Sequence, residues 1–296
     1  MRRGLLLMAY GTPERLEDVE RYYTHIRRGS APPPELLADL VSRYEAVGGT
    51  TALNRITRAQ AGGVARALAR RGHELPVYVG FKHVPPFVGD AVARMAAEGV
   101  EAAVGLALAP HYSLRSIAEY ERYAEAARPP GMALDVIRSW HDDPGLVAFL
   151  ASRLREALAR SKGDARVLFT AHSVPVPPSG LEDPYARQLE ETCELVARAA
   201  EVEGWEFAFQ SAGRTGDTWL GPDVLETIGA IADRGHDAVV LQAVGFVADH
   251  LETLYDLDVE ARRAAASRGL GYTRAEMPND DPAFVDVLAR IVETRL

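Results

Sequence analysis

Two apolar stretches decide the expected fold of this chain: Glu101-Ala102-Ala103-Val104-Gly105-Leu106-Ala107-Leu108-Ala109-Pro110 and Asp237-Ala238-Val239-Val240-Leu241-Gln242-Ala243-Val244-Gly245-Phe246. Each follows a helix-like segment that ends in a glycine, Gly99 or Gly235. A short continuous apolar run is typical of a strand that is covered on both faces, as in a parallel sheet. Because the pattern occurs once in each half, we expect two lobes of similar architecture.

Similar apolar runs lie on either side of these two stretches and alternate with amphipathic segments. The expected strands are 5–9, 76–81, 102–109, 167–171, 207–210 and 238–244. The expected helices include 58–71, 90–98, 144–160, 183–203 and 223–234. This alternation predicts an α/β fold with two Rossmann-like lobes, each a parallel sheet flanked by helices, and an active-site cleft between them. We expect the lobes at residues 1–142 and 143–296, with the last helix packing back on the first lobe.

The composition excludes several functional classes. A net charge of −9 over 296 residues argues against a nucleic-acid binder, because neutralising phosphates requires clustered Lys and Arg. No run approaches the roughly 20 apolar residues that span a bilayer, and the start of the chain resembles a strand rather than a signal peptide, so we expect a cytoplasmic protein without membrane insertion. The single cysteine, Cys193, has helical periodicity and is expected in the core.

One candidate site residue is the histidine in Phe169-Thr170-Ala171-His172-Ser173-Val174-Pro175, at the end of an expected strand. Ligand sites of open α/β sheets lie beyond the carboxyl ends of the strands. A neutral imidazole there can bind a divalent metal or accept a proton near neutral pH. A hydrogen-bonded structural histidine fits the same pattern, so His172 alone leaves both roles open.

An acidic segment follows the expected strand at 238–244. In an α-helix, residues spaced by four drift by about 40° per step, so Glu252, Asp256 and Glu260 would form one stripe. Carboxylates stacked in this way repel one another unless a cation lies among them, which suggests a route for a hydrated divalent ion. A solvated helix face is the alternative, although Asp249 and His250 make the cluster denser than such a face requires.

The first strand leads into Met8-Ala9-Tyr10-Gly11-Thr12-Pro13, where Gly11 allows a tight turn that would direct Tyr10 to the cleft. Arg27 precedes a rigid loop with three prolines and offers fixed donors that suit carboxylates. No glycine-rich phosphate fingerprint follows the first strand, so the fold does not imply a nucleotide. We expect His83 and His111, which also follow strands, to be structural.

Together these motifs resemble the ferrochelatase family, and most of all its compact bacterial branch that acts on coproporphyrin III. The strings that carry the resemblance are M-A-Y-G-T-P, R-Y-Y-T-H-I-R-R-G, R-Y-E-A-V-G-G, Q-S-A-G-R-T-G-D-T-W-L-G-P-D and G-F-V-A-D-H-L-E-T-L-Y-D. They occur in family order and cover nearly the whole chain.

The resemblance implies a role for particular residues. The family's metal-site histidine falls on His172 and its partner glutamate on Glu252, and both would be catalytic. The tyrosine that can ligate the iron of a metalloporphyrin falls on Tyr10, and the outer acidic positions of the metal route fall on Asp256 and Glu260. The porphyrin contacts fall on Tyr10, Arg27, Arg43, Tyr44, Thr51 and Tyr120. Thr51 and Thr170 stand where relatives commonly have serine, and both keep a hydroxyl.

The implied reaction is the insertion of Fe²⁺, as the substrate metal, into coproporphyrin III during haem biosynthesis. We expect no iron–sulfur cluster, because the chain lacks the carboxyl-terminal extension that holds one in many relatives and has only Cys193. We expect a monomer that makes transient contacts with neighbouring enzymes of the haem pathway. The alternatives are a protoporphyrin IX ferrochelatase, a cobalt or nickel chelatase of a related tetrapyrrole, and a non-enzymatic haem carrier with Tyr10 as axial ligand.

Overall fold

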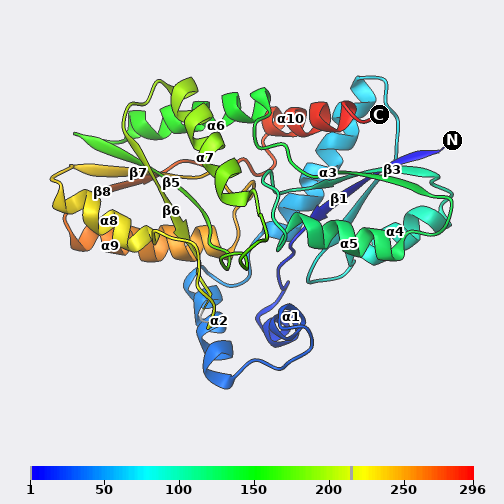
Figure 1. Cartoon of the computed structure of the whole chain (residues 1–296), viewed down its shortest axis with the longest axis horizontal. Helices are drawn as coiled ribbons and strands as arrows, with labels where there is room; N and C mark the ends of the chain where they lie inside the picture. The colour runs from blue at the N-terminus through cyan, green and yellow to red at the C-terminus, as the bar shows by residue number, and fades with distance from the viewer. Residues whose placement is uncertain (1, 214–215) are drawn as a thin grey trace.

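Two parallel sheets form the centres of two lobes that lie side by side (Figure 1). The structure is a computed structural model and describes residues 2–213 and 216–296. Within these residues, the first sheet has the strand order β2-β1-β3-β4 and the second has the order β6-β5-β7-β8. The strands are β1 Arg3–Ala9, β2 Val77–Phe81, β3 Ala102–Ala107, β4 Ala133–Ile137, β5 Ala165–His172, β6 Trp205–Gln210, β7 Ala238–Ala243 and β8 Gly271–Arg274.

The predicted fold class is confirmed, since all strand pairs in both sheets are parallel and helices flank each sheet. The two stretches that share a pattern form β3 and β7, which hold the same third place in their sheets. β7 is buried along its whole length, as its apolar run predicts. β4 and β8, the outer strands that the apolar runs do not predict, contain more polar and exposed residues.

The helices are α1 Val19–Ile26, α2 Pro34–Ala46, α3 Leu53–Arg70, α4 Val88–Ala97, α5 Ile117–Ala127, α6 Pro144–Arg160, α7 Tyr185–Ala200, α8 Val224–Asp233, α9 Arg262–Ser267 and α10 Pro282–Glu293. A 3₁₀ turn, Leu16–Asp18, precedes α1, and a π-helix, Glu252–Ala261, precedes α9. α1 and α2 project below the centre of the molecule, and the proline-rich segment between them is a loop, as predicted (Figure 1). α6 begins with Pro144, and the Asp143 side chain accepts hydrogen bonds from two backbone N–H groups of its first turn.

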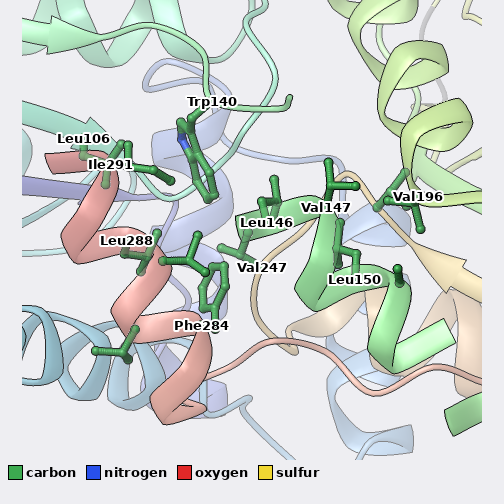
Figure 2. Close-up of a cluster of buried hydrophobic side chains, with 14 of the residues drawn as sticks. Leu106, Trp140, Leu146, Val147, Leu150, Val196, Val247, Phe284, Leu288 and Ile291 are labelled. Atoms are coloured by element: carbon green, nitrogen blue, oxygen red, sulfur yellow. The ribbon is translucent and has the colours of Figure 1, made fainter. Parts of the chain in front are cut away.

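One hydrophobic cluster runs through both lobes, and α10 links them. Figure 2 shows Phe284 of α10 in this cluster with Trp140, and their ring centroids are 6.3 Å apart. α10 also lies against α3 so closely that a Cβ atom on Gly63 would come within 2.7 Å of Val285 Cγ1. Cys193 of α7 is fully buried in the same cluster. The core is therefore continuous from the first sheet to the second.

Candidate active site

The candidate site lies where the two sheets reverse their strand order, next to the carboxyl ends of the strands. In open α/β sheets this position is the usual ligand site. Tyr10 follows β1, His172 ends β5, and Glu252 lies beyond the end of β7, so each belongs to a strand at the reversal. An ion pair of 3.5 Å between Arg43 Nη1, from the first lobe, and Asp256 Oδ1, from the second, spans the site.

His172 and Glu252 lie together, as the sequence motifs predict. His172 Nδ1 is 3.4 Å from Glu252 Oε2, and their side chains are 35% and 36% exposed. This distance suits an ion pair, but His172 Nδ1 makes no hydrogen bond in the described part of the chain. An imidazole nitrogen and a carboxylate oxygen placed in this way are suited to share a divalent cation.

Neighbouring side chains fix the backbone of this pair. The Tyr185 hydroxyl donates to the backbone carbonyl of His172 at 3.0 Å, and Gln210 Nε2 donates to the backbone carbonyl of Glu252 at 2.9 Å. Gly245 allows the two segments to approach, because a Cβ atom there would lie 2.6 Å from the Ala171 Cβ. The backbones of His172 and Glu252 are thus fixed by hydrogen bonds and close packing.

His250 is a third member of the site, and the sequence motifs assign it no role of its own. Its Nδ1 lies 3.0 Å from the backbone carbonyl of Ala248, and its Nε2 is 3.5 Å from Glu252 Oε2. Burial disfavours a charged ring, but the carboxylate of Glu252 outweighs it and raises the pKa of His250. The signal in the sequence is the position of His250 two residues before Glu252 on a segment that is already acidic.

The charge on Glu252 follows from these neighbours. Desolvation by the surrounding protein favours the neutral acid, but His172 and His250 oppose it and lower the pKa of Glu252 to about 2. Glu252 is therefore an anion at any physiological pH. The surrounding protein and the negative charge of Glu252 raise the pKa of Tyr10, which is 41% exposed and remains a neutral phenol.

The acidic stripe lies on a π-helix rather than on the α-helix that its spacing predicts. The segment Glu252–Ala261 has π-helical hydrogen bonding, in which each turn holds more residues than an α-turn. The expected drift of about 40° per four residues, which assumes 100° per residue, is therefore wrong for this segment. π-helical turns are rare in proteins, and those that occur often lie at functional sites. Their residue composition does not distinguish them from α-helix.

Asp256 and Glu260 lie on this π-helix, and Asp256 is held from two sides. Its Oδ2 accepts a hydrogen bond from Ser211 Oγ, and its Oδ1 pairs with Arg43. Burial, together with the negative charge of Glu252, raises the pKa of Asp256 to about 7. Glu260 is half-buried further along the same π-helix.

Tyr44 and Thr51 converge on the loop that follows Tyr10. The Tyr44 hydroxyl is 3.1 Å from Thr12 Oγ1, and Thr51 Oγ1 donates to the same atom at 3.4 Å. Lys82 Nζ lies 5.7 Å from the ring of Tyr10 and 5.5 Å from the ring of Tyr120. Tyr44 and Tyr120 are both buried, at 1% and 4% exposed.

Arg27 and Arg43 differ in their partners. Arg43 is bound to Asp39 at 3.1 Å and to Asp256, and it lies 5.1 Å from the ring of Tyr255. Arg27 lies 5.9 Å from the ring of Tyr23, and among residues 2–213 and 216–296 no carboxylate pairs with its guanidinium. Arg27 is therefore free to bind an acid that the protein does not supply.

His83 and His111 have structural environments. His83 is buried with its Nδ1 3.0 Å from His25 Nδ1, and burial, together with Lys82, lowers the pKa of His83 to about 3. His111 is 2.9 Å from Thr192 Oγ1, and burial likewise lowers the pKa of His111 to about 3. Of the motif 210–223, Arg214 and Thr215 lie outside the described residues.

His172 and the carboxylates that follow β7 lie at the carboxyl ends of strands in the second lobe, and solved metal chelatases share the fold of two parallel-sheet lobes. The chain is similar to the sirohydrochlorin chelatase SirB of Bacillus subtilis subspecies spizizenii in complex with cobalt, with a TM-score of 0.59, 11% identity and coverage of 99% of this chain and 95% of SirB. It is also similar to CbiX, with a TM-score of 0.55, 16% identity and coverage of 99% and 100%.

The particular family follows from the sequence. The family model described as Ferrochelatase matches residues 2–296, so this chain belongs to the ferrochelatase family and is an enzyme of the metal-inserting lyase type. It is 44% identical to the coproporphyrin III ferrochelatase of Bacillus subtilis, over 99% of this chain and 97% of the relative. It is also 44% identical to the ferrochelatase of Thermus thermophilus, over 98% of each chain. Among the described residues, no helix has the length and apolar character that crossing a membrane requires.

Proposed function

We propose that this enzyme inserts Fe²⁺ into coproporphyrin III at the site between its lobes. The observation that carries the proposal is the match of 44% identity, over 99% of the chain, to enzymes named coproporphyrin III ferrochelatase. The geometry supports it, because a His172–Glu252 pair on one lobe lies near Tyr10 of the other. Fe²⁺ is the substrate metal of this family.

The first lobe would bind the porphyrin. Coproporphyrin III carries four carboxylates, and Arg27, whose guanidinium has no carboxylate partner within residues 2–213 and 216–296, matches one of them in charge and shape. Thr51 offers a hydroxyl nearby on the loop held by Thr12. Four carboxylates also keep this porphyrin in water, whereas protoporphyrin IX has two and partitions into membranes. We therefore propose coproporphyrin III as the preferred substrate and the cytoplasm as the site of the reaction.

The second lobe would handle the metal. Glu252 is ionised, and an imidazole nitrogen of His172 lies beside it, so together they can replace part of the water shell of Fe²⁺. Asp256 and Glu260 continue the row of oxygen donors along the π-helix and would receive the hydrated ion first. We propose no iron–sulfur cluster, because Cys193 is the single cysteine and such a cluster is held by several thiolates.

Charge balance requires proton acceptors at this site. Inserting Fe²⁺ into a neutral porphyrin core releases the two N–H protons of the ring. We propose that His172 accepts a proton as the metal leaves it, and that Glu252, which stays ionised, relays the other proton to His250. The protons taken up would thereby replace the positive charge that the site loses when the metal departs.

Anaerobic insertion of Fe²⁺ into coproporphyrin III and protoporphyrin IX tests the proposal. The wild type should metallate coproporphyrin III faster, and Glu252→Gln should lower its kcat by at least about 100-fold, because an amide carries no charge and accepts no proton. Glu293→Gln is the matched control, since the Glu293 side chain is 35% exposed, against 36% for Glu252, and pairs with Arg71 away from the site.

Three outcomes would contradict parts of the proposal. Faster insertion into protoporphyrin IX would overturn the substrate preference. Insertion of Co²⁺ or Ni²⁺ but not Fe²⁺ would show a different chelatase. Haem binding without any insertion, unchanged in Glu252→Gln, would show a carrier.

A further inference from the structure

A buried arginine joins the two segments on either side of Glu252. Arg274, the last residue of β8, has a side chain that is 11% exposed. Its Nη2 donates to Asp249 Oδ1 at 3.0 Å, and Nε and Nη2 donate to the two carboxylate oxygens of Asp258 at 2.9 and 2.7 Å. Asp249 precedes Glu252, and Asp258 lies within the π-helix, so one guanidinium fixes the chain before and after the metal-site carboxylate.

Asn279 binds the other side of Asp249. Its Nδ2 donates to Asp249 Oδ2 at 2.8 Å, and its Oδ1 accepts from the Asp249 backbone N–H at 2.8 Å. The Asn279 backbone N–H donates to the carbonyl of Val247 at 3.0 Å. Asn279 has φ = 47°, in the left-handed region that asparagine tolerates better than most residues. Both oxygens of Asp249 therefore have a donor, and the loop that leads to Glu252 is held in one conformation.

This chain of hydrogen bonds continues into the first lobe. Gln60 of α3 is fully buried, and its Nε2 donates to the backbone carbonyl of Asn279 at 2.7 Å. On the same helix, Asn54 accepts from the Thr12 backbone N–H at 3.0 Å and donates to the Thr12 carbonyl at 2.8 Å. Thr12 lies two residues after Tyr10. One helix thus holds the Tyr10 loop at one point and the Glu252 loop at another.

The π-helix gives this network a particular importance. A π-helix has poorer local stability than an α-helix, so tertiary contacts must select it. If the segment relaxed to α-helical hydrogen bonding, the positions of Asp256 and Glu260 around the helix axis would change relative to Glu252. The two hydrogen bonds from Arg274 to Asp258 act within the π-helical segment and oppose such a change.

We propose that Gln60, Asn279 and Arg274 are positioning residues that set the place of the metal-site carboxylates, acting through Asp249 and Asp258. We call these five residues the polar brace. The Glu252 carboxylate itself pairs with His172 and His250, so the brace acts on it through the backbone. The inference rests on the proposed function, because it assigns Glu252 to the metal.

Arg274 and Arg262 both pair with the Asp258 carboxylate, so a comparison of substitutions at these two arginines tests the proposal. Arg274→Gln removes the link from Asp258 to Asp249. Arg262 pairs with the Asp258 carboxylate at 3.6 Å, lies 4.8 Å from the ring of Tyr272 and is 52% exposed, so Arg262→Gln removes a contact to Asp258 without touching the link to Asp249. Partners that orient metal ligands typically change metal affinity or activity by about 10- to 100-fold. We expect Arg274→Gln to lower kcat for Fe²⁺ insertion and to raise KM for Fe²⁺ by at least about tenfold, with KM for the porphyrin unchanged. Arg262→Gln should stay within about twofold of wild type.

A second readout does not depend on turnover. Co²⁺ added to the protein without porphyrin has a visible absorption spectrum that reports its ligands, and Arg274→Gln should weaken Co²⁺ binding by about tenfold and alter that spectrum. Arg274→Lys keeps the charge and should recover part of the affinity. If the wild type binds Co²⁺ but inserts no metal, the proposed function fails while the brace remains testable through this spectrum.

Asn279→Gly covers the case in which Arg274→Gln does not fold. Glycine accepts the left-handed backbone of residue 279, so only the amide contacts to Asp249 are lost. Glu201→Gly, at another left-handed residue with φ = 58°, is the matched control. A wild-type Co²⁺ spectrum and wild-type kcat and KM in a folded Arg274→Gln or Asn279→Gly protein would overturn the proposal, as would equal losses in Arg262→Gln.

Discussion

The two lobes use the same strand order for opposite kinds of chemistry. β1 and β5 occupy the same place in their sheets, and Tyr10 follows one while His172 ends the other. The first lobe therefore presents a neutral phenol where the second presents an imidazole suited to a metal. The two halves of the site therefore come from equivalent strand ends, and the residue at each strand end decides what chemistry that end can support.

The histidines of the two lobes extend this contrast. Burial lowers the pKa of both His83 and His111, in the first lobe, to about 3, and each stays neutral. In the second lobe, the carboxylate of Glu252 overcomes burial and raises the pKa of His250. Burial is common to all three, so the presence of an anionic partner explains the opposite sign. The second lobe therefore favours a proton on His250, and the first lobe disfavours one on His83 and on His111.

The connections after β1 and β5 also differ. In the first lobe the chain passes through α1 and α2, which project from the body of the molecule, before it returns in α3 (Figure 1). In the second lobe it passes directly to α7. The extra segment supplies Arg27, Arg43, Tyr44 and Thr51. We therefore expect the segment that contains α1 and α2 to bind the porphyrin. We expect the strand ends of the second lobe, which need no added segment, to bind the metal.

Substitution at the two equivalent strand ends should have the largest and most unequal effect. His172→Ala should lower kcat by about 10²- to 10⁴-fold, because it removes both a metal ligand and a proton acceptor. Tyr10→Phe should cost less than about tenfold, since a phenol with a raised pKa stays protonated and neither gives up nor takes up a proton near neutral pH. Stopped-flow porphyrin absorbance measures both, with the surface variant His73→Ala as control. Equal losses at positions 10 and 172 would remove the proposed division between the lobes.

The arginines of the added segment should have a smaller effect, confined to porphyrin binding. Arg27→Ala should raise KM for coproporphyrin III by about 10- to 100-fold, the range expected for one charged hydrogen bond. Arg28→Ala is the matched control, since Arg28 is 79% exposed and already pairs with Glu119. Initial rates at saturating Fe²⁺ give both values. An unchanged KM in Arg27→Ala would place the propionates elsewhere.

The smallest effect is on stability and tests the neutral histidines of the first lobe. Below about pH 6.5 the unfolded chain protonates residue 111, while the folded chain, with a pKa of about 3, does not. His111 therefore makes the fold less stable as the pH falls, by about 2 kcal/mol between about pH 8 and pH 5. Urea unfolding should show that His111→Gln removes this part of the pH dependence and that His73→Gln does not. An unchanged pH dependence would mean that His111 is protonated in the fold.

Much of the architecture could be predicted because most strands are buried on both faces. The continuous apolar runs of β1, β3, β5 and β7 identify parallel strands without reference to partners. Two edge strands, β4 and β8, are not predicted, because Asp135 interrupts β4 and β8 reads Gly-Tyr-Thr-Arg; the other two, β2 and β6, are predicted. The local pattern therefore predicts a strand only where apolar residues form a continuous run.

Some site residues could likewise be predicted from the sequence, and others could not. His172 and Glu252 lie in recognisable motifs, so the sequence alone suggests them. The contacts of Arg274 and Gln60 depend on segments far apart in the chain, and no local pattern marks them. The π-helix is hidden because its hydrogen-bond register leaves no trace in residue types.

The single thiol of the chain allows the separation of the two lobes to be measured with fluorescent labels. Cys193 is fully buried, and burial raises its pKa well above the ordinary value, so maleimide reagents should leave it unmodified. Ser42 of α2 and Ser267 of α9 are both exposed, one on each lobe. A Ser42→Cys, Ser267→Cys protein would accept a donor and an acceptor fluorophore without loss of the native cysteine. Energy transfer between them would then follow the separation of the lobes as porphyrin and metal bind.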